Sequence, residues 1–204
     1  MNPYNTHQQF LKHYIEKIKD QHQYDSDPRE ITVLELGCGD GSTPLLVDSL
    51  RGTNIRLISV DNDESWITRM KMKTNDEGIK HDYIHVKDKD KDKDKRDNND
   101  EGWDNVLRTL SEDRTYSLVF IDSSPWESRV MALKLFKDIS DYIIIHDVDY
   151  FVTNNIFGTM KNDELDYSDV FKKWRVYYPP KPWPYFTGPP TLVGTMGDFE
   201  IDRL

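Results

Sequence analysis

Residues 33–42, Val-Leu-Glu-Leu-Gly-Cys-Gly-Asp-Gly-Ser, join an apolar run to a turn with three alternating glycines. The apolar part predicts a buried strand, and the glycines after it let a ligand approach the bare backbone. The next apolar run, 55–60, ends in Asp61, at about the separation expected for a carboxylate that binds ribose hydroxyls. Together these features predict a pocket for a nucleoside-containing cofactor.

The spacing of the glycines distinguishes between two kinds of cofactor. The dinucleotide-binding pattern requires a glycine at the sixth position of the motif, where this chain has Ser42. The turn instead alternates Gly37, Gly39 and Gly41, and Glu35 precedes it. This arrangement resembles the first motif of the class I S-adenosylmethionine-dependent methyltransferases.

The resemblance implies an α/β, Rossmann-like fold: a seven-stranded, mostly parallel sheet with helices on both faces and a C-terminal antiparallel hairpin. It implies that the turn admits the methionine part of S-adenosylmethionine, that Asp61 bonds the ribose, and that Glu35 supports the turn or the cofactor's amino group. Asp88 or Trp103, at the two ends of a charged insertion, would lie near the adenine. The cofactor contacts predicted in this way are Glu35, Gly37, Gly39, Asp40, Gly41, Ser42, Asp61, Asn62, Asp88 and Asp122.

Alternating strand-like and helical patterns support the same fold, because they are typical of a parallel sheet wrapped by helices. The expected strands are 31–36, 55–60, 83–86, 117–122, 142–146, 174–178 and 191–196, and the expected helices are 5–22, 42–50, 64–75, 103–110 and 127–137. We predict a single domain over residues 1–204. It would include an N-terminal helix within 1–24, a mobile charged loop at 87–101 and an aromatic, proline-rich acceptor loop at 179–190.

The composition argues against several classes of partner. The net charge is −10, and the Lys-Asp tract at 87–97 carries six positive and five negative charges, so the acidity lies elsewhere in the chain. A nucleic-acid partner is not expected, because phosphate binding needs a basic face. Neither an 18-residue apolar run nor a basic, apolar leader is present, so we expect a soluble, cytoplasmic protein without a membrane partner. The single cysteine, Cys38, agrees with a reducing compartment. No oligomeric state is predicted.

Polar residues follow the apolar strands 117–122 and 142–146. Because the carboxyl ends of parallel strands meet at one edge of a sheet, we expect these residues to converge with the glycine turn. Methyl transfer to a hydroxyl needs a base that takes the acceptor's proton. His146 is the natural candidate, since the ordinary pKa of histidine lies near neutrality. The catalytic candidates are His146, Asp122, Asp147 and Asp149, the last two as competing bases or as carboxylates that orient His146.

The Val-Phe-Ile-Asp segment that ends at Asp122 is similar to the fourth motif of small-molecule O-methyltransferases. In some sugar and catechol enzymes of this kind, such an aspartate and later acidic residues hold magnesium, and Asp122, Asp147 and Asp149 offer that set. However, His146 stands where one acidic ligand is usual, and Ser124 stands where some sugar enzymes place their base. We therefore favour a base that works without metal, with magnesium as the open alternative.

The acceptor is predicted from the residues beyond the strand ends. Residues 122–126 lack the Asn/Asp-Pro-Pro-Tyr/Phe sequence of amino-group methyltransferases, which favours O-methylation. Our lead hypothesis is transfer to a sugar hydroxyl, for example of a deoxyhexose such as rhamnose on a glycan. The alternatives are a magnesium-using O-methyltransferase for a phenolic or other small metabolite, and a non-catalytic partner of a glycan-building enzyme that only binds the cofactor. The predicted acceptor contacts are Trp126, Arg129, Tyr150, Trp183, Tyr185 and Phe186.

Overall fold

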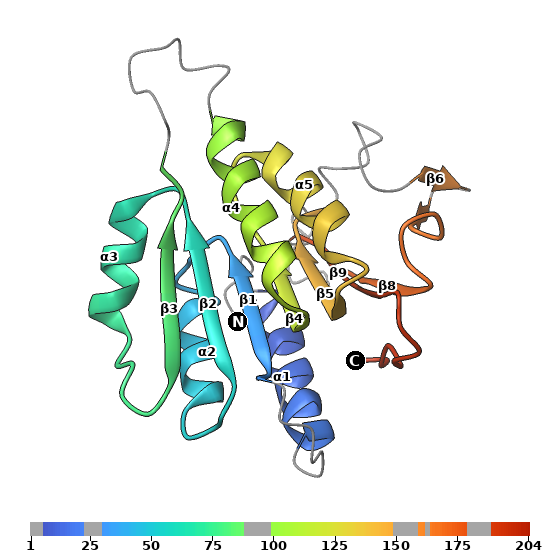
Figure 1. The fold of residues 1–204 in the computed structure, drawn as a ribbon. Helices are drawn as coiled ribbons and strands as arrows, with labels where there is room; N and C mark the ends of the chain where they lie inside the picture. Colours follow the sequence, from blue (N-terminus) through green and yellow to red (C-terminus); the bar gives the residue numbers. More distant parts are fainter. Residues whose placement is uncertain (1–5, 23–29, 88–98, 149–158, 162–163, 179–188) are drawn as a thin grey trace, which may run out of the picture.

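The structure, a computed structural model, describes residues 6–22, 30–87, 99–148, 159–161, 164–178 and 189–204. Figure 1 shows a twisted sheet with helices packed on both faces. The helices are α1 (Gln8–His22), α2 (Thr43–Leu50), α3 (Glu64–Lys73), α4 (Asn99–Asp113) and α5 (Trp126–Phe136). The strands are β1 (Thr32–Leu36), β2 (Arg56–Asp61), β3 (Lys80–His85), β4 (Tyr116–Ile121), β5 (Ser140–His146), β6 (Thr159–Lys161), β7 (Glu164–Asp166), β8 (Lys173–Tyr177) and β9 (Thr191–Thr195).

The main sheet has seven strands in the order β3-β2-β1-β4-β5-β9-β8. The strands β1 to β5 run parallel, and Leu36 at the end of β1 lies opposite Val60 and Ile121. Strand β9 runs antiparallel to both β5 and β8, which closes the sheet with a hairpin. This topology confirms the predicted fold class. It also brings the ends of β1, β2, β4 and β5 to one edge of the sheet.

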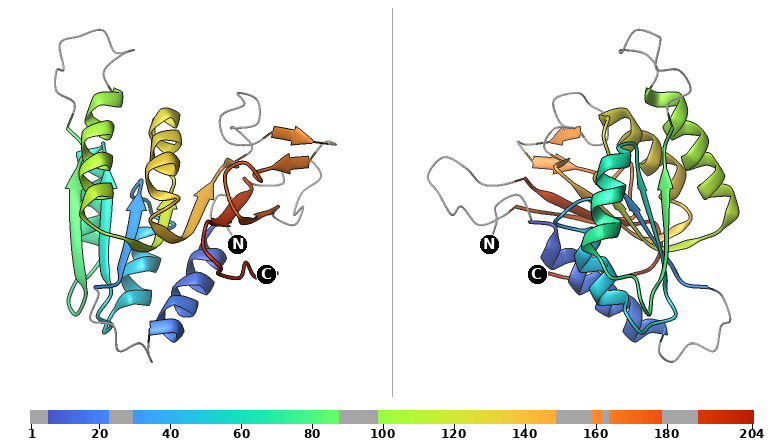
Figure 2. Two further views of the ribbon diagram at one scale, coloured as in Figure 1. Left: turned by 45° about the vertical axis from the view of Figure 1, so that its right-hand side comes forward. Right: turned by 90° about the vertical axis from the view of Figure 1, so that its left-hand side faces the viewer.

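Two large apolar cores and a smaller cluster beside α3 lie between the sheet and its helices in the described residues, and Figure 2 shows the helices on the two sides. Alternate residues of the central strands point to opposite faces. Val33 and Leu118 pack with α1 and α2, whereas Leu34 and Val119 pack with α4 and α5. Because both faces are covered, these strands are apolar at nearly every position.

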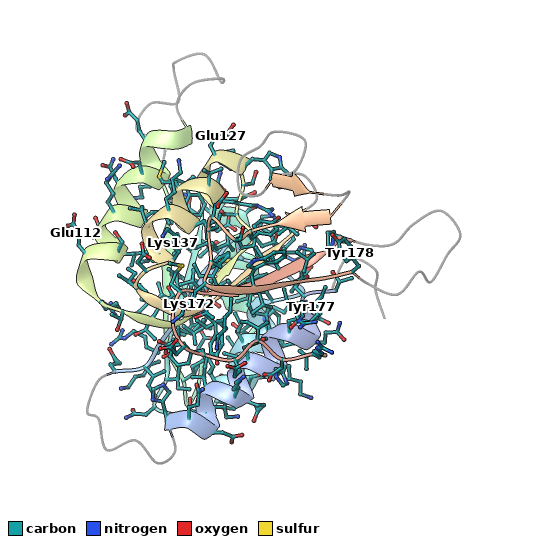
Figure 3. All side chains as sticks on the ribbon, turned by 90° about the vertical axis from the view of Figure 1, so that its right-hand side faces the viewer. Glu112, Glu127, Lys137, Lys172, Tyr177 and Tyr178 are labelled. Carbon is teal, nitrogen blue, oxygen red and sulfur yellow. The ribbon has the colours of Figure 1, made fainter. Side chains whose placement is uncertain are left out.

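Helix α1 is the amphipathic helix that the sequence predicts, and it packs against α2 and β4. The rings of Phe10 and Tyr177 lie 4.3 Å apart, and Figure 3 shows Tyr177 close to this helix. On the outer side, Lys17 Nζ donates to a carboxylate oxygen of Asp202 at 2.6 Å. The C-terminal residues therefore help to fasten α1 to the sheet. The buried side chains of the helix are Phe10, Leu11, Tyr14, Ile15 and Ile18.

The charged insertion ends earlier than predicted. Residues 99–101 belong to α4 and not to the expected loop at 87–101, so this boundary was wrong. Polar and acidic residues are favourable in the first turn of a helix, where they interact well with its dipole. Residues 88–98, to which the prediction of mobility mainly applies, lie outside the described residues.

Two strand predictions also need correction. Strand β3 begins at Lys80, three residues before the expected start. The prediction missed its first residues because this edge strand is only partly buried, so they form no apolar run. The short antiparallel pair β6 and β7 was not predicted, since three-residue strands without an apolar run leave no recognisable pattern. Most of the proposed acceptor loop, residues 179–188, falls outside the described part of the chain.

None of the helices in the described residues has the length and apolar character required to cross a lipid bilayer.

The docking of α1 is testable by truncating one buried side chain. Ile15 is fully buried, so we expect Ile15→Ala to lower the free energy of unfolding by about 2–5 kcal/mol. The exposed neighbour Lys12 serves as the control, and Lys12→Ala is expected to change it by no more than about 0.5 kcal/mol. Urea unfolding of the three proteins measures both effects. Equal stabilities would show that α1 does not pack on the sheet as described.

Candidate active site

The glycine turn after β1 lies directly against the end of β4. Gly37 has a φ of 98°, in the left-handed region that favours glycine. A Cβ atom at this position would lie 2.4 Å from the carbonyl oxygen of Asp122. The Gly37 N–H donates to the Val60 carbonyl and the Asp122 N–H donates to the Leu36 carbonyl, both at 2.8 Å. These contacts hold together the ends of β1, β2 and β4.

Glu35 supports the turn from inside the protein. Its carboxylate is completely buried and accepts hydrogen bonds from Thr43 Oγ1 at 3.0 Å and from Ser59 Oγ at 2.6 Å. Thr43 Oγ1 in turn accepts the N–H of Gly39 at 3.1 Å. Of the two roles that the resemblance implies for Glu35, these contacts match support of the turn. Burial raises the pKa of Glu35 to about 7, although the hydroxyls of Ser42, Ser59 and Thr43 work in the opposite direction.

Asp61 closes the turn from the end of β2. One carboxylate oxygen accepts the N–H of Cys38 and the other accepts the N–H of Asp63, both at 2.7 Å. Burial raises the pKa of Asp61, partly offset by these backbone donors. Each carboxylate oxygen has a second lone pair. Asp61 therefore keeps acceptor capacity that a ribose hydroxyl could use, and Asn62 follows it directly; the ribose contact itself stays a prediction.

The turn also leaves bare backbone beside this carboxylate. A Cβ atom on Gly39 would make only ordinary contacts, 3.7 Å to Ser42 Oγ and 4.0 Å to the Gly41 nitrogen. The absence of a side chain at Gly39 is thus not required by packing within the protein. Open backbone next to an acceptor carboxylate is the arrangement that a nucleoside-containing cofactor needs, so these residues fit S-adenosylmethionine.

Asp40 is a predicted cofactor contact within the glycine turn. Its carboxylate is exposed and pairs with two cations of α3, Arg69 and Lys73, the latter at 2.8 Å. Lys73 above all, and Arg69 with it, lower the pKa of Asp40 against the opposing effect of burial. Asp40 therefore links the glycine turn to α3, and its predicted contact with the cofactor stays a prediction.

Polar side chains gather where β4 and β5 end. His146 Nδ1 lies 3.3 Å from Asp122 Oδ2 and 3.4 Å from Asp147 Oδ1. The predicted convergence of these three residues is therefore present, whereas Asp149 lies outside the described residues. Asp147 has a φ of 57°, an uncommon conformation for a residue other than glycine, and such positions cluster at functional sites.

Thr6 and His7, in the turn before α1, complete this group of side chains. Thr6 Oγ1 donates to the Pro189 carbonyl at 2.8 Å and lies 3.2 Å from His146 Nε2. The rings of His7 and His146 meet edge to face with their centres 4.4 Å apart. Sequence reasoning missed both residues, because a threonine and a histidine beside an amphipathic helix form no motif. Only the docking of α1, helped by a hydrogen bond from the Gln8 side chain to the Gly41 carbonyl at 2.7 Å, brings them here.

Arg129 orients the same group from α5. Its guanidinium donates to the Ser123 carbonyl at 2.6 Å and to the His146 carbonyl at 2.9 Å, and lies 3.0 Å from Asp122 Oδ1. Only 6% of the residue is exposed. The prediction that Arg129 binds acceptor hydroxyls is therefore corrected: its donors are used inside the protein.

The ionisation of the group follows from these contacts. Burial alone would raise the pKa of Asp122, but His146, Arg129 and His7 outweigh it and hold the pKa below its ordinary value. Burial and the neighbouring His146 lower the pKa of His7 to about 4, against the opposing effects of Asp122 and the Gly41 carbonyl. At neutral pH, Asp122 is an ionised carboxylate and His7 is a neutral imidazole.

One cluster of possible ligand atoms contains two histidines, which magnesium does not prefer. His7, Asp122 and His146 each offer one ligand atom, and these atoms lie within 4.8 Å of one another. Magnesium prefers oxygen ligands in octahedral geometry, whereas two of these three donors are imidazole nitrogens. Imidazole is instead a typical ligand of zinc, copper, iron and nickel. This group therefore does not match magnesium. The set that the magnesium alternative names is Asp122, Asp147 and Asp149, and it stays a prediction because Asp149 lies outside the described residues.

The tryptophans predicted to contact the acceptor or the adenine differ in their exposure. Trp126 at the start of α5 is 37% exposed, with the Arg129 guanidinium 4.4 Å from its ring centre. Trp103, by contrast, is fully buried, and its indole N–H donates to the Ser124 carbonyl at 3.0 Å, so it is not available to an adenine. The remaining predicted residues lie outside the described residues: Asp88, Asp149, Tyr150, Trp183, Tyr185 and Phe186.

Comparisons with known proteins show the fold of the chain. Two structures of WbdD, one described as a bifunctional kinase-methyltransferase, are similar with TM-scores of 0.57 and 0.56 and identities of 11% and 12%. They cover 94% and 97% of this chain, which spans only 40% of either WbdD chain. The METTL16 methyltransferase domain is similar with a TM-score of 0.50 at 13% identity, over 93% of this chain and 66% of that one.

No family model matches the sequence, and neither does any curated protein. The structural likeness therefore establishes the class I methyltransferase fold that the glycine motif predicts.

The buried Glu35 predicts a specific pH dependence. A carboxyl with a raised folded-state pKa contributes stability that is complete below its ordinary pKa and is lost as the pH rises through the folded value. As the pH rises from 4.5 to about 7, the contribution of Glu35 to the free energy of unfolding should therefore fall by up to about 3 kcal/mol. Glu35→Gln has no such titration, so urea unfolding should show a flatter pH profile over this range. Parallel profiles would contradict the prediction.

Proposed function

We propose that the chain is an S-adenosylmethionine-dependent O-methyltransferase that acts on a hydroxyl of a small molecule or glycan, with a sugar hydroxyl as the favoured acceptor. One observation carries the proposal: Asp122 belongs to both halves of the site. Its backbone lies against Gly37 of the glycine turn, and its carboxylate lies 3.3 Å from His146. A methyl donor bound on the turn would therefore lie beside Asp122, His146 and Asp147, which we call the acid-base group.

The chemistry of O-methylation requires both halves. S-adenosylmethionine supplies a methyl group on a sulfonium; a carbon-oxygen bond forms as the carbon-sulfur bond breaks, and S-adenosylhomocysteine and a proton are released. A hydroxyl attacks efficiently only as it loses that proton. Asp122, His146 and Asp147 offer negative charge and an imidazole at the place where the proton must leave.

The fixed geometry of the Asp122–His146 pair supports the proposal as much as the basicity of these side chains does. Arg129 and Thr6 contact the two sides of the Asp122–His146 pair, and groups held in a fixed geometry avoid the cost of ordering them during the reaction. The exposed Trp126 stands beside this group on α5. Its indole is a suitable surface for the apolar side of a sugar ring, and the acidic balance of the chain disfavours nucleic acid as the acceptor.

Two alternatives have less support. A magnesium-dependent enzyme for phenolic acceptors would take its oxygen ligands from Asp122, Asp147 and Asp149, of which Asp149 lies outside the described residues. In a non-catalytic partner, cofactor binding alone would not require Asp122, His146 and Arg129 to lie close together. Transfer of labelled methyl to a panel of glycosides and catechols distinguishes these possibilities from the proposal.

The variant His146→Gln tests the role of the acid-base group. We expect labelled-methyl transfer to the best acceptor of the panel to fall by about 10²–10⁴-fold, because proton transfer contributes about that much. S-adenosylmethionine binding, measured by calorimetry, should remain intact, since His146 is not part of the glycine turn.

His13→Gln is the matched control, because His13 pairs with Asp202 on the outer side of α1. It should leave methyl transfer unchanged. Full activity of His146→Gln would refute the assigned role of His146, and labelling of catechols alone would refute the sugar acceptor.

A further inference from the structure

Thr6 determines the tautomer of neutral His146, that is, which of its two ring nitrogens carries the proton. A threonine hydroxyl has a single hydrogen, and that of Thr6 is donated to the Pro189 carbonyl at 2.8 Å. Towards His146 Nε2, which lies at 3.2 Å, the Thr6 oxygen can only accept. Neutral His146 therefore carries its proton on Nε2 and its lone pair on Nδ1.

This tautomer sets two acceptors opposite each other. The bare Nδ1 atom lies 3.3 Å from the ionised Asp122 Oδ2 and makes no well-formed hydrogen bond to any described residue. Two lone pairs at this distance repel each other unless a positive charge lies between them. Either a proton on Nδ1 or a metal ion would supply that charge.

His7 favours the metal ion over the proton. Only 4% of this residue is exposed, and within the described part of the chain neither ring nitrogen has a hydrogen-bond partner of good geometry. Leaving buried polar atoms unsatisfied is costly. A proton between His146 and Asp122 would do nothing for His7, whereas an ion would be bound by all three residues.

We propose that His7, Asp122 and His146 form a binding site for a divalent transition-metal ion such as zinc or cobalt. Two neutral imidazole nitrogens and one carboxylate oxygen each donate a lone pair, and nothing is oxidised or reduced. Ligand atoms on one such ion lie about 3–4 Å apart. The three ligand atoms lie within 4.8 Å of one another, so a shift of about 1 Å completes the site.

The surroundings have the features of an outer ligand shell. A histidine that binds a metal usually donates its other ring N–H to a neighbour, and a ligating carboxylate is itself hydrogen-bonded. Thr6 serves His146 in this way, and Arg129 lies 3.0 Å from the second oxygen of Asp122. Three protein ligands leave positions open on the ion. If the proposed function holds, an acceptor hydroxyl bound there would become more acidic. In the metal-bound state His146 would then act as a ligand of the ion instead of as the base; metal binding itself does not depend on the proposed function.

Cobalt(II) absorption tests the site without cofactor or acceptor. The metal-free chain is titrated with cobalt(II), and we expect one equivalent to bind with visible bands typical of nitrogen ligands. Zinc should displace the cobalt, and a large excess of magnesium should not. Absence of stoichiometric binding, or displacement by magnesium, would overturn the proposal. Neither result would bear on methyl transfer, so the two proposals can fail separately.

Matched variants assign the ligands. A change in the outer shell of a metal site typically weakens binding by about 10–100-fold. His7→Gln and Asp122→Asn each remove a ligand, so they should weaken cobalt binding by more than that. Thr6→Val should weaken it within that range, and Thr6→Ser should restore it because serine keeps the hydroxyl. His22→Gln, at the far end of α1, should bind as the parent chain does. Circular dichroism confirms the fold of each variant, and unaltered cobalt affinity in His7→Gln would overturn the assignment.

Discussion

The contact between Gly37 and the backbone of Asp122 is the constraint on which the site depends. A Cβ atom on Gly37 would lie 2.4 Å from the Asp122 carbonyl oxygen, so only glycine allows the turn after β1 to approach β4 this closely. That approach fixes how far the glycine turn lies from the Asp122 carboxylate and the His146 imidazole at the ends of β4 and β5. On the proposed function, the sheet would therefore set the distance between methyl donor and acceptor.

Buried polar groups hold the turn in this position. Glu35, Thr43 and Ser59 join β1, α2 and β2 through hydrogen bonds in the apolar interior, and Ser59 Oγ also lies 2.9 Å from His81 Nε2 on β3. Such groups are expensive to bury unless their partners are present. The network thus makes the conformation of the turn specific, while the apolar packing around it supplies most of the stability.

Much of the fold was predictable from sequence because its signals are local. The apolar runs of β1, β4 and β5 and the helical spacing in α1 identify elements by period alone, and Asp61 and Asp122 are identified by their positions at strand ends. Thr6 and His7 could not be found in this way, because their place depends on how α1 packs more than a hundred residues away from His146 in sequence. Arg129 was misjudged for a related reason: sequence shows a cation near the site but not that the protein's own carbonyls use its donors.

The binding of S-adenosylmethionine to a Gly39→Ala variant tests the central claim most directly. The backbone of Gly39 has room for a Cβ atom within the protein, but that atom would occupy the place assigned to the cofactor. We predict that the parent chain binds the cofactor stoichiometrically in a calorimetric titration. The variant should unfold at the same urea concentration and bind no cofactor. Lack of binding by the parent chain, or equal affinity in the folded variant, would contradict a cofactor site on the glycine turn.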